Sequence, residues 1–135
     1  MQPIIIEVAT TGELENAIAE MARQQAQALF VRASDLFYDN RVLLGSTAMK
    51  YALPTLAAEK EILEAGALVS YIPNTAELDQ RYAAFIDRIL RGAKPADLPI
   101  EQPTKFELII NLKTAKALGI VIPQTLLDRA AEVIQ

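Results

Sequence analysis

Residues 66–92, GALVSYIPNTAELDQRYAAFIDRILRG, contain the pattern that decides the fold. Residues 67–72 are mostly apolar, partly β-branched and followed by a proline, which is typical of a strand buried on both faces. Asn74 offers a side-chain oxygen to the free N–H groups of a helix start, and Glu77 follows at the capping-box position. Apolar residues then recur at steps of three and four until Gly92, which can end a helix in the left-handed conformation. The stretch predicts a core strand, a short polar loop and an amphipathic helix whose apolar stripe belongs to the core. The side chains of this stripe are Leu78, Tyr82, Phe85, Ile86, Ile89 and Leu90.

The preceding residues alternate between the same two patterns. Thr10 and Glu13 form a capping pair before one helix, and Asp39 can cap another, in which Gly45 costs about 1 kcal/mol relative to alanine. Strands alternating with helices predict an α/β fold, a three-layer doubly wound parallel sheet with right-handed connections. The predicted strands are residues 3–9, 28–31 and 54–57, and the predicted helices are residues 10–22, 41–51 and 59–65.

The character of the sequence changes after Gly92. Residues 93–104, AKPADLPIEQPT, hold three prolines and predict an extended surface connection. We therefore expect an α/β ligand-binding lobe over residues 1–92, and a segment over residues 93–135 that completes this lobe or reaches a partner. Within that segment the patterns predict a strand at residues 105–111 and helices at residues 114–118 and 125–134.

The composition restricts the function. The 135 residues include no cysteine and no histidine, which excludes most zinc sites and the common Ser-His and Cys-His nucleophile pairs. A net charge of −4 argues against nucleic acid as a partner. Five scattered glycines form no phosphate-binding loop, so nucleotide binding has no motif behind it. Enzymatic chemistry would have to use carboxylates, lysines or tyrosines, and we expect no enzyme activity, no cofactor and no metal. We also find neither an apolar run of membrane-spanning length nor an export signal at the amino terminus.

Polar side chains follow three of the predicted strands. Because the carboxyl ends of parallel strands meet at one edge of a sheet, we expect these side chains to form a ligand-binding edge. Hydroxyl and amide groups can bond polar ligand atoms, a carboxylate can hold an amine, and a tyrosine ring can stack on an aromatic part. Each residue alone also has a structural interpretation, such as a helix cap for Asn74, a turn for Asp35 or the core for Tyr71. The candidate ligand-binding residues are Ser34, Asp35, Glu59, Ser70, Tyr71 and Asn74.

The segments KPADLPIEQPTKFELIINLKTAKALG, from Lys94, and IPQTLLDRAAEVI, from Ile122, resemble the end of the substrate-binding proteins of ABC importers, in the tryptophan/tyrosine branch. GALVSYIPN, ASDLFYDNR and LPTLAAEKE are similar to the loops before that ending, so the resemblance covers essentially the whole chain. It implies the carboxyl-terminal lobe of a two-lobed clamshell of the type I periplasmic-binding-protein kind, with KFELIIN crossing the hinge. It also implies a small organic solute such as an amino acid or aromatic compound, an ABC permease as partner, and a place in the periplasm or tethered outside the membrane for the full-length parent. Related sequences that bind amino acids tend to carry aspartate where Asn74 lies, so the ion pair that it forms with an ammonium group is absent here.

Two further hypotheses concern partners. Phe106, Leu108 and Ile110 alternate along a predicted strand, and an exposed apolar surface of this kind tends to find a partner. We therefore expect a homodimer through the region after Gly92. The alternative function is a stand-alone α/β signalling or protein-interaction module, although the residues ATT after the first predicted strand lack the acidic cluster of a receiver domain.

Overall fold

A computed structural model describes residues 2–135 of the chain as one five-stranded sheet flanked by helices. The strand order is β1-β2-β3-β4-β5, in which β1, β2 and β3 are mutually parallel, β4 is antiparallel to β3, and β5 is parallel to β4. The α/β class predicted from the sequence is confirmed, with the difference that the sheet is mixed rather than all parallel. The strands are β1 (Leu29–Val31), β2 (Thr55–Ala57), β3 (Val69–Pro73), β4 (Phe106–Asn111) and β5 (Glu132–Ile134).

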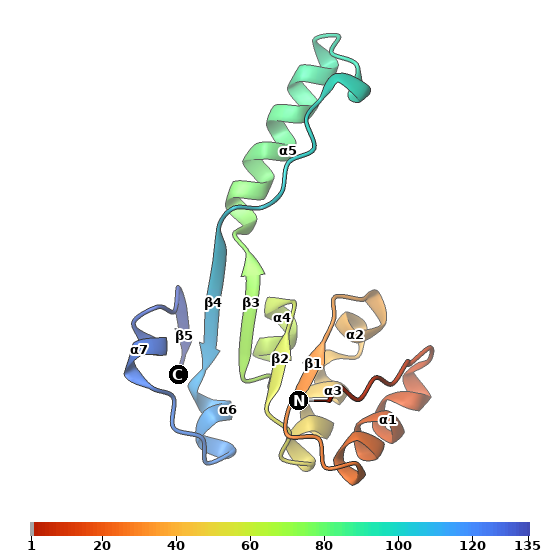
Figure 1. Cartoon of the computed structure of the whole chain (residues 1–135), viewed down its shortest axis with the longest axis vertical. Helices are drawn as coiled ribbons and strands as arrows, with labels where there is room; N and C mark the ends of the chain where they lie inside the picture. Colours follow the sequence, from red (N-terminus) through yellow and green to blue (C-terminus); the bar gives the residue numbers. More distant parts are fainter. Residues whose placement is uncertain (1) are drawn as a thin grey trace.

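Helices connect the strands and bury one face of the sheet against a common core (Figure 1). The deepest core side chains include Leu44, Ile62 and Leu63, which come from α3 and α4 and pack with residues of β1, β2 and β3. α6 and α7 lie beside β4 and β5, and α1 lies at the opposite end of the strand order, beyond β1 (Figure 1). The helices of this body are α1 (Thr11–Arg23), α2 (Asp35–Asp39), α3 (Arg41–Lys50), α4 (Lys60–Glu64), α6 (Leu112–Ala117) and α7 (Gln124–Leu127).

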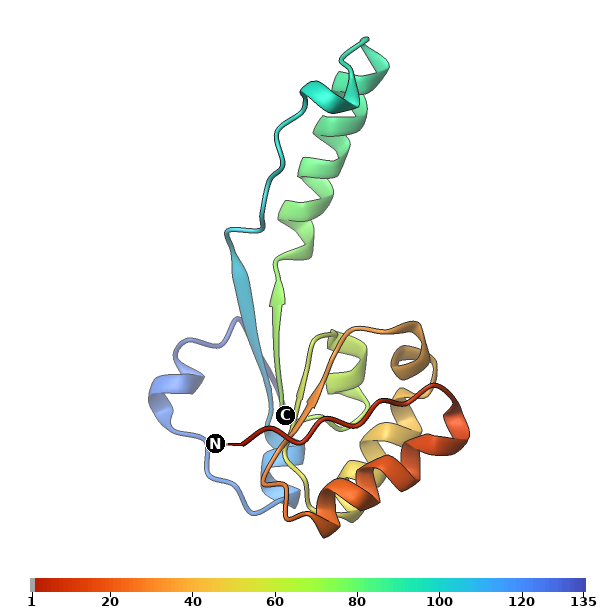
Figure 2. The ribbon, with the colours of Figure 1, turned by 45° about the vertical axis from the view of Figure 1, so that its right-hand side comes forward.

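The helix α5 (Thr75–Leu90) does not pack on this body. With the 3₁₀ turn η1 (Pro95–Asp97) and the returning chain up to residue 105, it projects from the end of β3 as an arm (Figures 1 and 2). Every residue of α5 is exposed or half-buried, and Leu90 is 81% exposed. The prediction that its apolar stripe belongs to the core is therefore wrong, because β3 directs the helix away from the sheet. None of the helices in residues 2–135 combines the length and the apolar character that a membrane crossing requires.

The amino-terminal segment is extended but is not a strand. Residues 3–9 pair with no strand of the described chain, so the predicted first strand is wrong. Ile4, Ile6 and Val8 are nevertheless half-buried in alternation with more exposed neighbours, and Val8 packs against the core. The β-branched pattern thus reports side-chain packing without backbone pairing. The next element, α1, begins as predicted, since the backbone N–H groups of Ala9 and Thr10 donate to the Glu13 carboxylate at 2.9 and 3.3 Å.

Two other predictions about the elements are corrected by the structure. Residues 125–134 were expected to form a helix, but only α7 is helical and Glu132–Ile134 forms β5. The edge of β4 accounts for this difference, because it pairs with β5 and its Leu108 carbonyl accepts the Ala131 N–H at 2.8 Å. The strand β3 is buried on one face rather than both, with Ser70 and Ile72 buried and Tyr71 exposed.

Gly45 in α3 lies where two backbones come very close together. A Cβ atom placed on Gly45 would lie 2.0 Å from the carbonyl oxygen of Ala65, at the end of α4. The residue that looked unfavourable on helix propensity is therefore required by the contact between α3 and α4.

We expect Gly45→Ala to destabilise the chain by about 1–3 kcal/mol, because overpacking against a backbone carbonyl outweighs the gain in helix propensity. Urea unfolding followed by circular dichroism measures this change. Gly12→Ala in α1 is the matched control, since a Cβ atom there meets nothing within 4 Å and should stabilise the helix by up to about 1 kcal/mol. Equal effects of the two substitutions would contradict the close contact.

Candidate ligand-binding edge

The carboxyl ends of β1 and β2 bring three of the predicted residues to one edge of the sheet. Ser34 and Asp35 follow β1 at the start of α2, and Glu59 follows β2 at the start of α4. The two strands are parallel neighbours, with Val31 in register with Ala57. The prediction that these side chains share an edge is therefore confirmed for β1 and β2, and we call these three residues the β1–β2 edge.

Glu59 has an unusual environment. Its Oε2 atom is buried and finds no hydrogen-bond partner among residues 2–135. Burial, followed by the negative charges of Glu61 and Asp35, raises the pKa of the Glu59 carboxyl above its ordinary value. A cationic group beside Glu59 would give the buried oxygen a partner and would offset the negative charges of Glu61 and Asp35. Across residues 2–135, His, Cys, Asp and Glu side chains form no group of three that could hold a metal ion.

A hollow of about 740 Å³ lies next to Ser34. It is shallow and largely open to solvent, and it is bordered by the amino-terminal segment and the chain between β1 and α2. Arg32 and Phe37 line it but were not among the predicted site residues, although Arg32 directly follows a predicted strand. Arg32 is the lining residue that carries a positive charge. The lining residues are Ile5, Ile6, Glu7, Val8, Ala9, Glu13, Arg32, Ala33, Ser34 and Phe37.

Ser70 and Asn74 have structural roles in this fold. Ser70 is fully buried and its hydroxyl donates to the Ala57 carbonyl at 3.0 Å, so it presents no surface to a ligand. Asn74 caps α5, because its Oδ1 accepts the Glu77 N–H at 2.8 Å, while its Nδ2 donates to the Glu107 carboxylate. Both side chains are thus engaged within the fold, and ligand binding by them stays a prediction.

Tyr71 lies apart from the β1–β2 edge. Its ring is 58% exposed and stacks on Phe106 with the ring centroids 5.3 Å apart. Because β3 continues past the point where β2 ends, this pair lies nearer the base of the arm than Glu59 does. The pair is an exposed aromatic surface. The sequence pattern did not point to Phe106 as its second member, because only the antiparallel register of β3 and β4 places Phe106 beside Tyr71.

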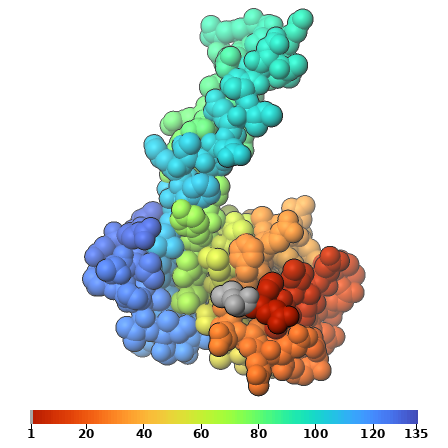
Figure 3. Space-filling model, in the orientation of Figure 1, coloured from red at the N-terminus to blue at the C-terminus, as the bar shows by residue number. Residues whose placement is uncertain are grey.

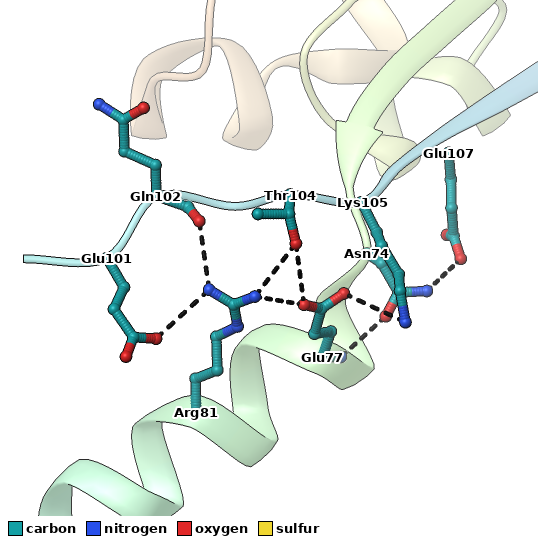
Figure 4. Close-up of polar contacts among 8 residues, drawn as sticks. All are labelled: Asn74, Glu77, Arg81, Glu101, Gln102, Thr104, Lys105 and Glu107. Carbon is teal, nitrogen blue, oxygen red and sulfur yellow. Dashed lines mark hydrogen bonds and ion pairs between the residues drawn. The ribbon is translucent and has the colours of Figure 1, made fainter.

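A polar network holds the arm together at its base (Figure 4). Arg81 binds Glu77 one turn earlier in α5, and it also pairs with Glu101 at 3.3 Å and donates to the Gln102 carbonyl at 3.2 Å. Thr104 and Lys105 approach the same Glu77 carboxylate, with Lys105 Nζ at 3.7 Å. The hydrogen bond from Arg81 is the main cause that lowers the pKa of Glu77. The network therefore fixes the returning chain along α5.

The comparisons with known proteins identify the family. Residues 4–134 match the model of the family described as ABC transporter substrate binding protein. The match covers nearly the whole sequence, and the chain belongs to this family.

Relatives agree with this assignment and are longer than the chain. A curated relative, the tyrosine-binding protein of Clostridioides difficile (strain R20291), is 24% identical over 111 residues, which are 82% of this chain and 32% of the relative. A solved ABC domain from Streptococcus pneumonia in complex with L-Trp is 28% identical, with a TM-score of 0.83 over 94% of this chain and 44% of that one. A conserved domain protein from Vibrio cholerae has the same fold, with 21% identity and a TM-score of 0.84 over 93% of this chain and 42% of that one. The chain thus spans less than half the length of each of these proteins.

We expect Glu77→Gln to lower stability at neutral pH, because it removes the charge that binds Arg81 and Lys105. A carboxyl whose pKa is lowered by folding stabilises the folded state above its unfolded pKa, and this contribution is lost as the pH falls through its folded pKa. The difference in urea midpoint between the native chain and Glu77→Gln should therefore shrink below about pH 4. Asp87→Asn is the control, since the exposed Asp87–Arg91 pair contributes only a few tenths of a kcal/mol. A difference that stays constant from pH 7 to pH 3 would contradict this role of Glu77.

Proposed function

We propose that this chain is the carboxyl-terminal, ligand-binding lobe of the solute-binding component of an ABC importer. Membership of the substrate-binding family supports the class of function. The observation that carries the proposal is the β1–β2 edge, where Ser34, Asp35 and Glu59 lie at the ends of neighbouring parallel strands and Ser34 lines a hollow of about 740 Å³. In sheets of this kind, ligands bind where parallel strands end and helices begin.

The side chains of the β1–β2 edge, together with those that line the hollow, favour a small solute with an amine and an apolar or aromatic part. The orphaned Glu59 oxygen and the neighbouring Asp35 charge favour an ammonium group. Arg32 and Phe37 both line the hollow. The Arg32 guanidinium can pair with a ligand carboxylate, and the Phe37 ring offers an aromatic surface. A free amino acid with an aromatic side chain combines these groups. The names of two relatives, one tyrosine-binding and one in complex with L-Trp, agree with such a ligand.

The proposed binding by this chain alone is weak. A small-molecule site normally covers most of the ligand surface, whereas the hollow is largely open to solvent. The related proteins are more than twice as long as their matched parts, and in the full-length parent we infer a second lobe that closes the site.

The same proposal gives the parent protein its partners and place. The full-length parent delivers the solute to an ABC permease from the periplasm or from a membrane tether outside the cytoplasm. Its task is binding and release, so the proposed function includes no catalysis. The carboxylate at Glu59 serves as a ligand for a cation rather than as an acid or base.

We expect L-tyrosine and L-tryptophan to bind the chain with dissociation constants on the order of 1 mM, equivalent to about −4 kcal/mol. Titration followed by amide chemical shifts in NMR spectra measures this affinity, and shifts should concentrate at residues 32–37 and 58–60. Analogues that lack the amine should bind more weakly, as should the Glu59→Gln variant with the intact amino acids. Glu64→Gln is the control, because Glu64 is exposed on the same helix and its carboxylate has no buried unpaired oxygen.

Micromolar binding by the chain alone would contradict the inferred need for a second lobe. Equal binding by Glu59→Gln and the native chain would remove Glu59 from the site. Shifts confined to the exposed Tyr71–Phe106 pair would move the site to the base of the arm.

We also expect Glu59→Gln to stabilise the unliganded chain near pH 7. The pKa of Glu59 is raised by folding, so its contribution to stability is present below its unfolded pKa and is lost as the pH rises through its folded pKa. The gain from the amide should therefore be largest at neutral pH and should fade below about pH 4.5. Thermal unfolding at a series of pH values measures the melting temperatures of the two chains. A lower melting temperature for Glu59→Gln than for the native chain at pH 7 would mean that Glu59 has a structural partner.

A further inference from the structure

The Glu59 carboxylate has no cationic partner within the described chain. Among residues 2–135 it takes part in no ion pair, and its Oε2 atom is buried without a hydrogen-bond partner. The charged side chains that act on it are Glu61 and Asp35, and both are acidic. Glu59 occupies the N-cap position of α4, but its side chain makes no capping hydrogen bond. Buried carboxylate oxygens are normally paired, so the lack of a partner here requires a physical cause.

The lysine that follows Glu59 in the sequence is held by a different carboxylate. Lys60 Nζ donates a hydrogen bond to Glu132 Oε2 at 2.6 Å, and the two groups form an ion pair. This hydrogen bond is the main cause that raises the pKa of Lys60 above its ordinary value. The other acidic side chains that act on Lys60 are Glu64, on α4, and Glu107, on β4. The Lys60 ammonium group is thus directed toward β4 and β5 rather than toward Glu59.

The register of the sheet explains how Glu132 reaches Lys60. One row of paired residues crosses all five strands on the face that α4 covers, and its first four members are buried. Glu132 ends this row on β5, which lies three strands from β2, a distance of about 14 Å. Ile62 and Leu63 are 0% exposed and fix the backbone of α4 over the row. The row consists of Val31, Ala57, Ser70, Ile109 and Glu132.

The two ends of this row lie at opposite sides of the body. Val31 and Ala57 lead into the loops of the β1–β2 edge, whereas Glu132 lies on the last strand in the sheet order. In the space-filling view the blue carboxyl-terminal part and the red amino-terminal segment, which borders the hollow, lie on opposite sides of the body (Figure 3). The ion pair with Glu132 therefore holds the Lys60 ammonium group away from the hollow.

Lys60 is the lysine with the shortest chain connection to Glu59. Its stem is flexible and its ammonium group is compact, so a released Lys60 side chain can reach the carboxylate of the preceding residue. Only the side chain has to turn, because Ile62 and Leu63 keep α4 in place. A lysine bound to Glu59 in this way would take the position that the proposed function gives to the ammonium group of a ligand.

We propose that Glu132 is a positioning residue of the ligand site, because by binding Lys60 it keeps Glu59 unpaired and available to the ammonium group of a ligand. The identity of the ligand rests on the proposed function, whereas the separation of Lys60 from Glu59 is a property of the unliganded chain. A carboxylate that already holds a lysine gains little from a second cation. An unpaired one distinguishes a ligand amine from an analogue without the amine.

Two substitutions break the same ion pair and distinguish this role from a structural one. In Glu132→Gln the released Lys60 can bind Glu59, so the pKa of Glu59 should fall relative to the native chain. In Lys60→Gln the pair is equally broken but the lysine is gone, so the pKa of Glu59 should stay raised. The chain with both substitutions should also keep the raised pKa of Glu59. NMR titration of the Glu59 side-chain carboxyl carbon measures this pKa in each chain without any ligand.

Binding of L-tryptophan by the same chains gives the second measurement. Glu132→Gln should bind it about threefold more weakly than the native chain, the size expected for a partly exposed ion pair, while Lys60→Gln and the double variant should bind it as the native chain does. The Lys60 and Glu132 side chains are 39% and 45% exposed, so circular dichroism should show that these variants remain folded.

Glu64→Gln is the matched control for Glu132→Gln. Glu64 also acts on Lys60 but forms no ion pair with it in the described chain, so the substitution removes one negative charge and leaves the Lys60–Glu132 pair intact. It should change neither the pKa of Glu59 nor the binding of L-tryptophan.

The pKa measurements decide the proposal by themselves. An unchanged pKa of Glu59 in Glu132→Gln would overturn it. Equal falls of this pKa in Glu132→Gln and Lys60→Gln would also overturn it, because the ion pair would then act only through the structure of α4. If none of the chains binds L-tryptophan, the proposed function fails, and the pKa of Glu59 in the variants still shows whether Glu132 keeps Lys60 away from it.

Discussion

The antiparallel pairing of β3 with β4 holds this structure together. Five registered residue pairs join Val69–Pro73 to residues 106–110 of β4, and they connect the three parallel strands to the carboxyl-terminal part of the sheet. At the far end of the pair, the Asn74 N–H donates to the Lys105 carbonyl at 3.0 Å. The chain leaves and re-enters the sheet through these two adjacent strands, so everything between them must project as an arm. The direction of α5 follows from that pairing.

The unequal lengths of the strands divide the candidate site. β1 and β2 stop at Val31 and Ala57, whereas β3 continues beyond Ser70 to the arm. The loops after the two shorter strands therefore form the β1–β2 edge, while Tyr71 is carried past it. Placing the Glu59 carboxylate at this edge costs stability in the free chain, since burial and two like charges disfavour its ionised form. A carboxylate that is unfavourable for folding and lies where parallel strands end is a candidate for a role in binding.

The exposed apolar side chains of α5 and those on the uncovered sheet face over β1 to β3, such as Phe30 and Tyr71, share one cause. Layered α/β folds stabilise a sheet by covering both of its faces, and in the described chain the helices α1, α3 and α4 cover only one face over β1 to β3. Apolar surface that is gathered into patches, rather than scattered singly, is typical of an interface. The family relationship agrees with this reading, because the related structures contain more than twice as much chain as the part that matches.

The sequence by itself determined most of the elements and the position of the β1–β2 edge. Caps such as Asn74 and Glu13 act within four residues, so their patterns predicted where α5 and α1 begin. Alternation of strands and helices likewise placed Ser34 and Glu59 at one edge. Only the tertiary structure decided that Ser70 is buried against Ala57, and that apolar side chains of α5 such as Ile86 and Leu90 are exposed. The physical reason is that periodicity shows which residues share a face, while burial depends on what packs against that face.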